Sequence, residues 1–187
     1  MRVLEQPMAG VYLLEPEAHH DERGRFSRCF CVEELDRLDA NTGIVQANIS
    51  HSHRCGTLRG LHYQHPPFAE TKYVQCVSGR IHDVVLDLRP RSATFRRWYA
   101  AGLDDRNGWI MVIPEGCAHG FMTLEEDCAV QYFVTAPHAP QHEAGVRHDD
   151  PAFAIRWPMA PRAISARDAS HPLFDERVSP MGETCPA

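Results

Sequence analysis

A histidine and an arginine flank a glycine in one short strand-like run, Leu58-Arg59-Gly60-Leu61-His62-Tyr63-Gln64. Lys72 opens a second strand-like run, and Tyr132 lies in a third. The unperturbed pKa of histidine, roughly 6.5, makes His62 a candidate general base near neutral pH. A fixed cation such as Lys72 suits stabilisation of an enolate oxygen or a phosphate. Together these residue types predict proton removal from a carbon beside a carbonyl, on a substrate that carries phosphate.

Three further residues suit supporting roles, although each type occurs more often in a structural role. Tyr132 could return a proton from the side opposite to the base. Asp168, in Ser165-Ala166-Arg167-Asp168, could hold a histidine in the correct tautomer. His119 follows Pro114-Glu115-Gly116-Cys117-Ala118 and is either a second polar anchor or a histidine that lines a barrel. The combination of these residues, rather than any one of them, carries the functional prediction.

Gly60 determines whether Arg59 and His62 act at one site. Strict strand alternation places these two side chains on opposite faces. A glycine inside a strand often marks a bulge. We therefore predict a bulge at Gly60 that turns both Arg59 and His62 inward.

Most of the elements that position these residues have the sequence pattern of β-strands. Only two short helices are predicted. One lies near residues 32–38, where Val32, Leu35 and Leu38 fall on one face, and the other begins at Ser165, a favourable N-cap. Ser78-Gly79 is typical of a hairpin turn. Many short strands, frequent turns and few helices favour an all-β barrel or sandwich, whose mouth can hold one ligand. The predicted strands cover residues 73–77, 80–88, 109–113, 120–124 and 129–134.

Composition and charge restrict the class of protein. The 187 residues fit one domain, 1–187, in which about 176–187 form a loose tail. The net charge of -6 argues against nucleic-acid binding, and no apolar run approaches membrane-spanning length. The odd number of cysteines, seven, without a Cys-x-x-Cys pair, predicts reduced thiols in a cytoplasmic protein, with Cys76 and Cys128 buried.

Competing chemistries have weaker support in the residues. A metal site is one such possibility, because small barrels with inward histidines often bind divalent ions, but His62 lacks a His-x-His partner and Gln64 is a poor ligand for a transition metal. The chain has no Gly-x-Ser-x-Gly elbow, no Gly-x-Gly-x-x-Gly fingerprint and no P-loop. We expect no metal and no organic cofactor.

From about Gly10 to Phe174 the chain resembles the dTDP-4-dehydrorhamnose 3,5-epimerase family. The resemblance rests on motifs in a fixed order, and their combination is far more specific than any one of them. They are Asp21-Glu22-Arg23-Gly24-Arg25-Phe26, Val45-Gln46-Ala47-Asn48, Leu58 to Gln64, Lys72, Pro114 to Phe121, Tyr132 and Ser165-Ala166-Arg167-Asp168.

The resemblance implies a cupin-like jelly-roll barrel and a cofactor-free epimerase acting on a nucleotide-diphosphate 4-keto-6-deoxy sugar. His62, oriented by Asp168, would remove a proton beside the C4 carbonyl. Lys72 would stabilise the enolate, and Tyr132 would protonate the other face. Substrate-binding roles are implied for Arg23, Phe26, Gln46, Asn48, Arg59, His119, Glu143 and Arg167. Family members are homodimers with exchanged strands, so that Arg23 and Phe26 would reach the neighbouring chain's site.

Two positions depart from the family pattern, both at places implied in base recognition. Arg28 replaces a usual acidic residue, and His138 replaces a usual tyrosine that stacks on thymine. These departures keep a different nucleotide or sugar open, for example a GDP-linked one. A keto-sugar isomerase, a metal-dependent cupin enzyme and a non-catalytic sugar-binding module also stay open at this point. The residues leave open whether C3, C5 or both are inverted.

Overall fold

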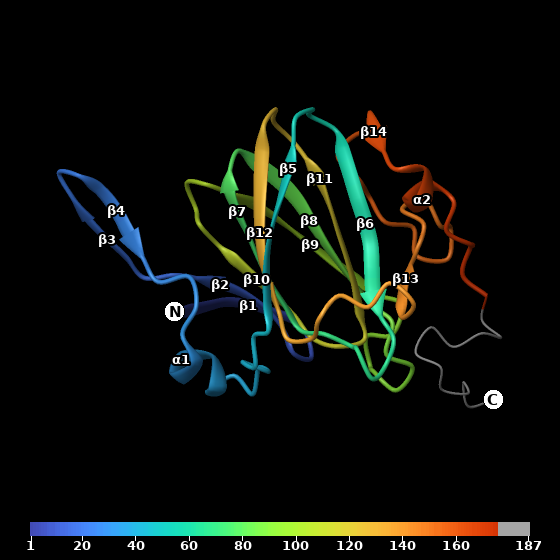
Figure 1. Cartoon of the computed structure of the whole chain (residues 1–187), viewed down its shortest axis with the longest axis horizontal. Coiled ribbons are helices and arrows are strands. Elements are labelled where there is room, and N and C mark those ends of the chain that lie inside the picture. Colours follow the sequence, from blue (N-terminus) through green and yellow to red (C-terminus); the bar gives the residue numbers. More distant parts are fainter. Residues whose placement is uncertain (176–187) are drawn as a thin grey trace.

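The computed structural model describes residues 1–175, in which two β-sheets pack face to face (Figure 1). The predicted tail at 176–187 lies outside the described residues. In order across the first sheet, the strands are β1 (Arg2–Met8), β2 (Val11–Glu15), β10 (Ile110–Ile113), β7 (Lys72–Ser78), β12 (Cys128–Val134) and β5 (Gln46–Ser52). Those of the second are β13 (Glu143–Gly145), β6 (Thr57–Gln64), β11 (Cys117–Thr123), β8 (Arg80–Asp87) and β9 (Trp98–Asp104). The two-residue β14 (Ala163–Ile164) pairs with β6 in parallel.

Most consecutive strands from β5 to β13 lie in opposite sheets, as in a jelly roll. The hairpin predicted at Ser78-Gly79 is therefore wrong. β7 pairs with β10 and β12, whereas β8 pairs with β9 and β11. Gly79 has a φ of +75°, and a Cβ there would lie 2.7 Å from Cys128 Sγ. A tight turn at this glycine carries the chain from one sheet to the other, which a two-residue turn pattern does not distinguish from a hairpin.

Three apolar clusters explain why the central strands β10 and β11 are buried on both faces. The largest packs part of the space between the sheets, where Val74 and Met111 of the first meet Val85 and Phe121 of the second. Another covers the outer face of the second sheet with residues from the C-terminal part, such as Phe153. The third covers the outer face of the first sheet. Consequently β11 is buried at every position and shows no alternation.

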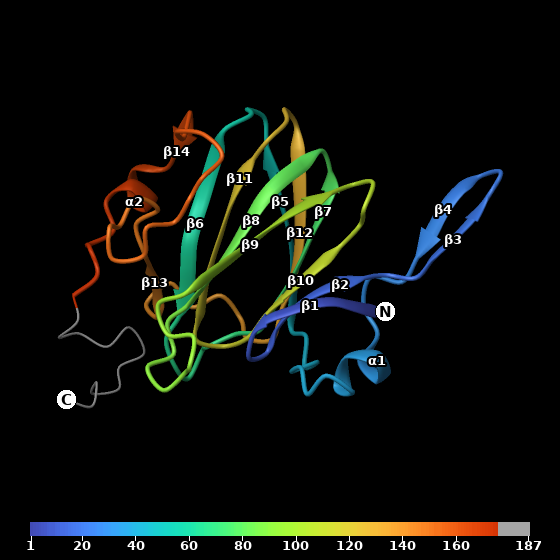
Figure 2. The same ribbon diagram turned by 180° about the vertical axis from the view of Figure 1, so that it is seen from behind.

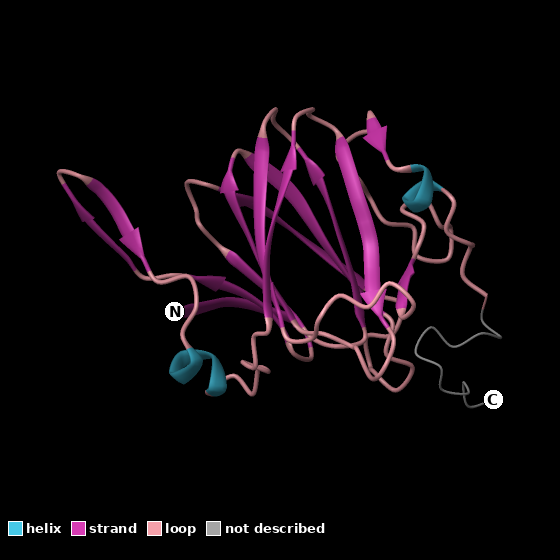
Figure 3. Cartoon of the chain, viewed as in Figure 1, coloured by secondary structure: helices cyan, strands magenta, loops and turns pink. Residues whose placement is uncertain are grey.

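Helices are few and short (Figure 3), as the sequence predicted. The first helix, α1 (Val32–Asp36), ends two residues before the predicted boundary; Leu35 is buried against the first sheet, whereas Val32 is largely exposed. The second, α2 (Ala166–Ala169), follows Ser165, whose Oγ accepts a hydrogen bond from the Asp168 N–H at 3.0 Å. The N-cap prediction is therefore confirmed. No helix within residues 1–175 is long and apolar enough to cross a membrane.

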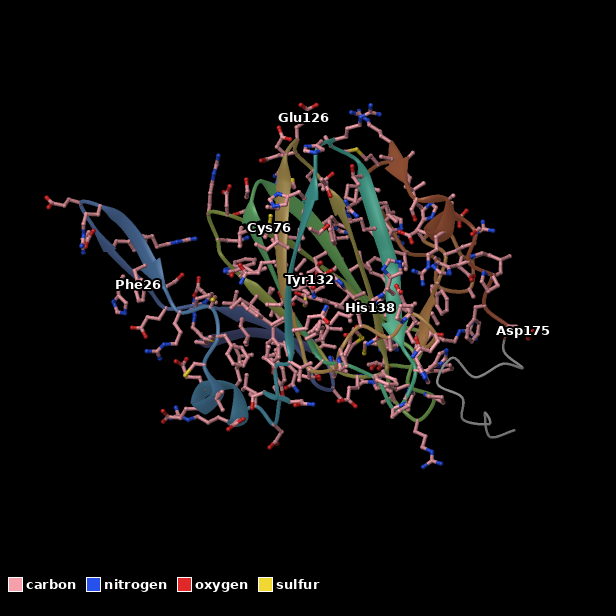
Figure 4. The ribbon with its side chains drawn as sticks, in the orientation of Figure 1. Phe26, Cys76, Glu126, Tyr132, His138 and Asp175 are labelled. Atoms are coloured by element: carbon pink, nitrogen blue, oxygen red, sulfur yellow. The ribbon has the colours of Figure 1, made fainter. Side chains whose placement is uncertain are left out.

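A two-stranded arm projects from the barrel (Figures 1 and 2). It consists of β3 (Ala18–Asp21) and β4 (Gly24–Ser27), which pair only with each other within residues 1–175. Phe26 lies on this arm with 73% of its surface exposed (Figure 4).

Asp87, at the end of β8, makes the free energy of unfolding depend on pH in the acid range. Burial by itself raises the pKa of Asp87, but hydrogen bonds from Arg89, Ser92 and Thr94 outweigh it and lower the pKa to about 2. A carboxyl with a lowered folded-state pKa stabilises the fold above its unfolded pKa, and this contribution is lost as the pH falls. Between about pH 6 and pH 3 we expect wild type to lose about 1 kcal/mol more unfolding free energy than Asp87→Asn.

Urea denaturation at the two pH values measures this difference. Glu126→Gln is the control, because Glu126 is exposed at a loop tip (Figure 4). Equal losses in wild type and Asp87→Asn would contradict the assignment.

Candidate active site

Two adjoining cavities open between the sheets, with volumes of about 480 and 280 Å³. His62, Lys72 and Tyr132 line both of them, which makes these residues the boundary between the two. Arg59, His119, Arg167 and Asp168 line the larger cavity only. Gln46, Asn48, His138 and Glu143 line the smaller cavity only. A volume of this size accommodates a small organic ligand.

The backbone at Gly60 brings Arg59 and His62 to the larger cavity. The pairing of β6 with β11 shifts register between His62 and Arg59. Gly60 has a φ of +107°, and a Cβ there would lie 2.6 Å from the Gly120 Cα. Only glycine fits this approach. The predicted bulge is confirmed, and Arg59 points toward β5, where it donates to Ser52 Oγ at 3.1 Å.

His62 forms a hydrogen-bonded pair with Asp168. Its Nε2 lies 2.8 Å from Asp168 Oδ1, while Oδ2 accepts the Gly60 N–H at 3.1 Å. Burial by itself raises the pKa of Asp168, but these hydrogen bonds and the His62 charge outweigh it and lower the pKa to about 2. The carboxylate is therefore ionised at neutral pH and only accepts. In the neutral form of His62, this carboxylate holds the imidazole proton on Nε2, so the free lone pair is on Nδ1.

Lys72 comes from the opposite sheet and reaches the His62 backbone. Its Nζ lies 3.5 Å from the His62 carbonyl oxygen and 3.2 Å from Glu70 Oε1. Both side chains of the Lys72–Glu70 pair are nearly buried, at 11% and 10% exposure. Lys72 is also the only lysine in the sequence. A buried ion pair at the cavity wall fixes the position of this cation.

Tyr132 lies on β12, in the sheet that faces His62 (Figure 4). Burial and the charge of Glu70 raise the pKa of its phenol, and Arg59 opposes them in part. The phenol is accordingly protonated at neutral pH and can act as an acid. His62 on β6 and Tyr132 on β12 therefore lie on opposite walls of the space between the two sheets.

His119 forms a second histidine–carboxylate pair beside the first. It is the register partner of His62 on β11, and its Nε2 lies 2.7 Å from Asp83 Oδ1. Asp83 is fully buried. The pair presents a fixed imidazole to the larger cavity.

The smaller cavity is lined by a polar network. Gln46 Nε2 donates to Asn48 Oδ1 at 2.9 Å, and Gln46 Oε1 accepts the His138 N–H at 3.2 Å. Glu143 Oε2 lies 2.9 Å from Arg167 Nη2 and 3.8 Å from His138 Nε2. The amide and imidazole groups that line the smaller cavity can hydrogen-bond a polar ligand.

Three of the sequence-predicted residues lie away from both cavities of this chain. Arg23 and Phe26 lie on the projecting arm. Arg28 follows the arm and pairs with Glu34 of α1 at 2.9 Å. Their predicted contacts with substrate therefore require a second chain.

Sequence reasoning missed three residues at this site, namely Glu70, Asp83 and His171. The sequence does contain a signal for Asp83, because an acidic residue inside the apolar run of β8 indicates a buried carboxylate with a partner. Glu70 and His171 lie outside strands, and no sequence pattern indicates a role for them. His171 lies beside the pair, with its ring centroid 6.1 Å from that of His62, and burial lowers its pKa.

Comparison with known proteins identifies the family. The family model for dTDP-4-dehydrorhamnose 3,5-epimerase matches residues 5–176. The chain belongs to this family. The dTDP-4-dehydrorhamnose 3,5-epimerase of Sinorhizobium fredii NGR234 is 43% identical over 170 residues, which cover 90% of this chain and 87% of the relative. Membership of the dTDP-4-dehydrorhamnose 3,5-epimerase family makes the protein an isomerase of the sugar-nucleotide epimerase class, as its motifs predicted.

Two solved structures extend the likeness to the fold. The Bacillus anthracis dTDP-4-dehydrorhamnose 3,5-epimerase, solved with TDP and PPi bound, has a TM-score of 0.90 and 38% identity, and the match covers 92% of this chain and 99% of the other. A Streptomyces bikiniensis 3'-monoepimerase in complex with dTDP-quinovose has a TM-score of 0.84 and 33% identity, covering 90% and 85%. The predicted cupin-like jelly roll is thus confirmed for this member of the epimerase family.

Proposed function

We propose that the protein inverts one or both carbons that flank the C4 ketone of a dTDP-4-keto-6-deoxy sugar, of the dTDP-4-dehydro-6-deoxyglucose to dTDP-4-dehydrorhamnose type. The observation that carries this proposal is the arrangement of His62 and Tyr132 on facing sheets, with the Lys72 ammonium nearby. Inversion requires proton removal from one face of a carbon and return to the other. A base and an acid on opposite walls of one cavity meet that requirement.

His62 Nδ1 takes the proton from the carbon beside the ketone, and the Asp168 carboxylate stabilises the imidazolium that forms. Asp168 has this capacity because its Oδ1 lies 2.8 Å from His62 Nε2 and its pKa is held at about 2. The electron pair of the broken C–H bond moves to the C4 oxygen and forms an enolate. Tyr132 then donates its phenolic proton to the opposite face of the carbon.

Lys72 stabilises the enolate oxygen by its charge. The C4 carbonyl itself acidifies the neighbouring carbon, and the sugar is neither oxidised nor reduced overall. The proposed reaction consequently requires neither an organic cofactor nor a metal. Preorganised charge at the developing oxyanion supplies the remaining stabilisation.

Lys72→Ala is expected to lower turnover by about 10²-fold or more, the effect of removing one oxyanion partner. The Lys72–Glu70 pair is buried, so Lys72→Ala also leaves Glu70 without its partner. The double variant Lys72→Ala/Glu70→Gln removes that unpaired charge and separates the two effects. Initial rates by NMR measure the loss. Full turnover in the double variant would remove Lys72 from the mechanism.

Substrate binding is assigned to the remaining polar residues of the cavities and to the arm of a second chain. Arg59, Arg167 and His119 suit the diphosphate or the sugar, because guanidinium and imidazole groups hydrogen-bond phosphate. Gln46, Asn48, Glu143 and His138 suit the nucleoside at the smaller cavity. We propose a cytoplasmic homodimer with exchanged strands, in which Arg23, Phe26 and Arg28 complete the partner's site. An arm with Phe26 exposed in a single chain supports this arrangement.

A panel of nucleotide-linked 4-keto-6-deoxy sugars tests the proposal. Proton NMR of the products identifies which of C3 and C5 has been inverted, and calorimetry compares dTDP, UDP, GDP and CDP as ligands. We expect inversion with the dTDP-linked sugar and preferential binding of dTDP. Preference for another base would assign Arg28 and His138 to altered base recognition and overturn the dTDP assignment. A moved carbonyl would identify an isomerase instead.

A further inference from the structure

His171 lies against the His62–Asp168 pair but takes no part in the reaction proposed above. Its Nε2 lies 4.0 Å from Asp168 Oδ1, and its side chain is only 12% exposed. This buried Nε2 has no hydrogen-bond partner within the described part of the chain. Buried polar atoms almost always have a partner, so an imidazole nitrogen left without one needs an explanation.

The position of the His171 ring is fixed from two sides. His171 follows Asp168 by three residues and lies just beyond the end of α2, so the backbone of this short helix holds the two side chains near each other. On its other side the ring packs on Gly145 of β13, where a Cβ would lie 2.1 Å from His171 Nε2. Gly145 is in turn the register partner of His62. Because Gly145 has no side chain, the His171 imidazole can lie against its backbone and close to the Asp168 carboxylate.

Three ligand atoms therefore converge beside the larger cavity. His62, Asp168 and His171 each offer one ligand atom, and these three atoms lie within 4.8 Å of one another; Nε2 of each histidine is the atom nearest to Asp168 Oδ1. A tetrahedral zinc ion, with bonds of about 2.0–2.1 Å, holds its ligand atoms roughly 3.4 Å apart. The separations of 2.8 and 4.0 Å would both reach this value if the Asp168 oxygen moved by roughly 0.6 Å away from His62 and toward His171. Two imidazoles with one carboxylate suit zinc better than magnesium, which prefers oxygen ligands.

We propose that this group is an inhibitory zinc site, in which Zn²⁺ binds His62 Nε2, Asp168 Oδ1 and His171 Nε2. Coordination requires the lone pair of His62 Nε2, which carries the proton when His62 is hydrogen-bonded to Asp168. On binding, this proton moves to Nδ1, so that His62 stays neutral and no electron is transferred. The basic lone pair of Nδ1 is then lost, and Asp168 is bound to the metal. Zinc bound at this site would therefore inactivate His62 as a base without occupying the larger cavity, where the substrate binds.

Metal binding tests the site without any substrate. Protein freed of metal by EDTA and then by dialysis is equilibrated with ZnSO₄, and bound zinc is measured by elemental analysis; CoCl₂ provides an absorption spectrum of the same site. We expect one ion per chain. His171→Phe keeps a ring on Gly145 but has no ligand atom, and should weaken zinc binding by at least the roughly 10–100-fold that loss of an outer partner costs.

Two further variants keep this binding test decisive. His171→Glu places a carboxylate oxygen at about the same reach from the backbone as the imidazole nitrogen and should keep the site. His53→Ala removes an exposed histidine that pairs with Asp127 elsewhere, and should bind as wild type does. Unchanged affinity in His171→Phe, or no zinc bound by wild type, would overturn the proposal.

Inhibition is the second readout, and it rests on the proposed function. Zinc should inhibit wild type reversibly, with EDTA restoring the rate, whereas His171→Phe should turn over normally in EDTA and resist zinc. MgCl₂ at equal concentration controls for metal bound to the substrate's diphosphate and should not inhibit. Equal zinc inhibition of wild type and His171→Phe would contradict the site. If wild type lacks epimerase activity, the proposed function fails, while the binding measurements still decide the zinc site.

Discussion

Replacement of His62 by alanine is expected to lower epimerisation by about 10⁴-fold, the upper range for loss of a general base. We assign the role of base to His62 because its Nε2 is hydrogen-bonded to Asp168, which leaves Nδ1 as the second ring nitrogen, and because His62 lines both cavities. The neighbouring His119 is held by Asp83 through its own Nε2 and stays on the adjacent strand. Product formation by NMR measures the loss.

His53→Ala is the matched control, because it removes an exposed histidine far from the pair and should retain the wild-type rate. Thermal denaturation checks that His62→Ala is folded. A folded His62→Ala protein with turnover within about tenfold of wild type would transfer the role of base to another group.

Replacement of Tyr132 by phenylalanine is expected to lower inversion by about 10³-fold while the protein stays folded. The ring remains to pack against the core between the sheets, and only the hydroxyl is removed. His62 is unchanged, so proton removal continues, and the proton returns from the same face without inversion. The change should therefore separate exchange of the substrate's carbon-bound hydrogen from formation of the epimer.

Tyr73→Phe is the control for a removed tyrosine hydroxyl. The Tyr73 hydroxyl donates to the Asn41 carbonyl oxygen at 2.6 Å, and Tyr73 lines neither cavity. Product NMR should show wild-type inversion in Tyr73→Phe. Wild-type inversion in Tyr132→Phe would exclude Tyr132 as the acid.

The sequence predicted the family, the all-β class and the bulge at Gly60, because these depend on local residue types and their order. Gly60 is informative since a glycine between Arg59 and His62 has a local consequence for the backbone. The turn at Ser78-Gly79 shows the limit of such reasoning. A tight turn is recognised from its residues, but whether the next strand pairs with the last one or crosses to the other sheet depends on partners far along the chain.

The residues that support the site were harder to predict for the same reason. Asp83 reaches His119 only because β8 and β11 are neighbours, and Glu70 meets Lys72 only because both side chains are buried together. His171 depends on the close approach of Gly145. Arg28 pairs with Glu34 within one chain, so its predicted role in binding a base stays a prediction.

Solvent deuterium incorporation shows whether His62 removes a proton from a carbon beside the C4 ketone. The dTDP-linked 4-keto-6-deoxy sugar is incubated in deuterated water with wild type or His62→Ala, and proton NMR follows the signals at C3 and C5. Loss of one or both signals with wild type, and retention of both with His62→Ala, is the predicted result. Incorporation by His62→Ala at the wild-type rate would contradict the account.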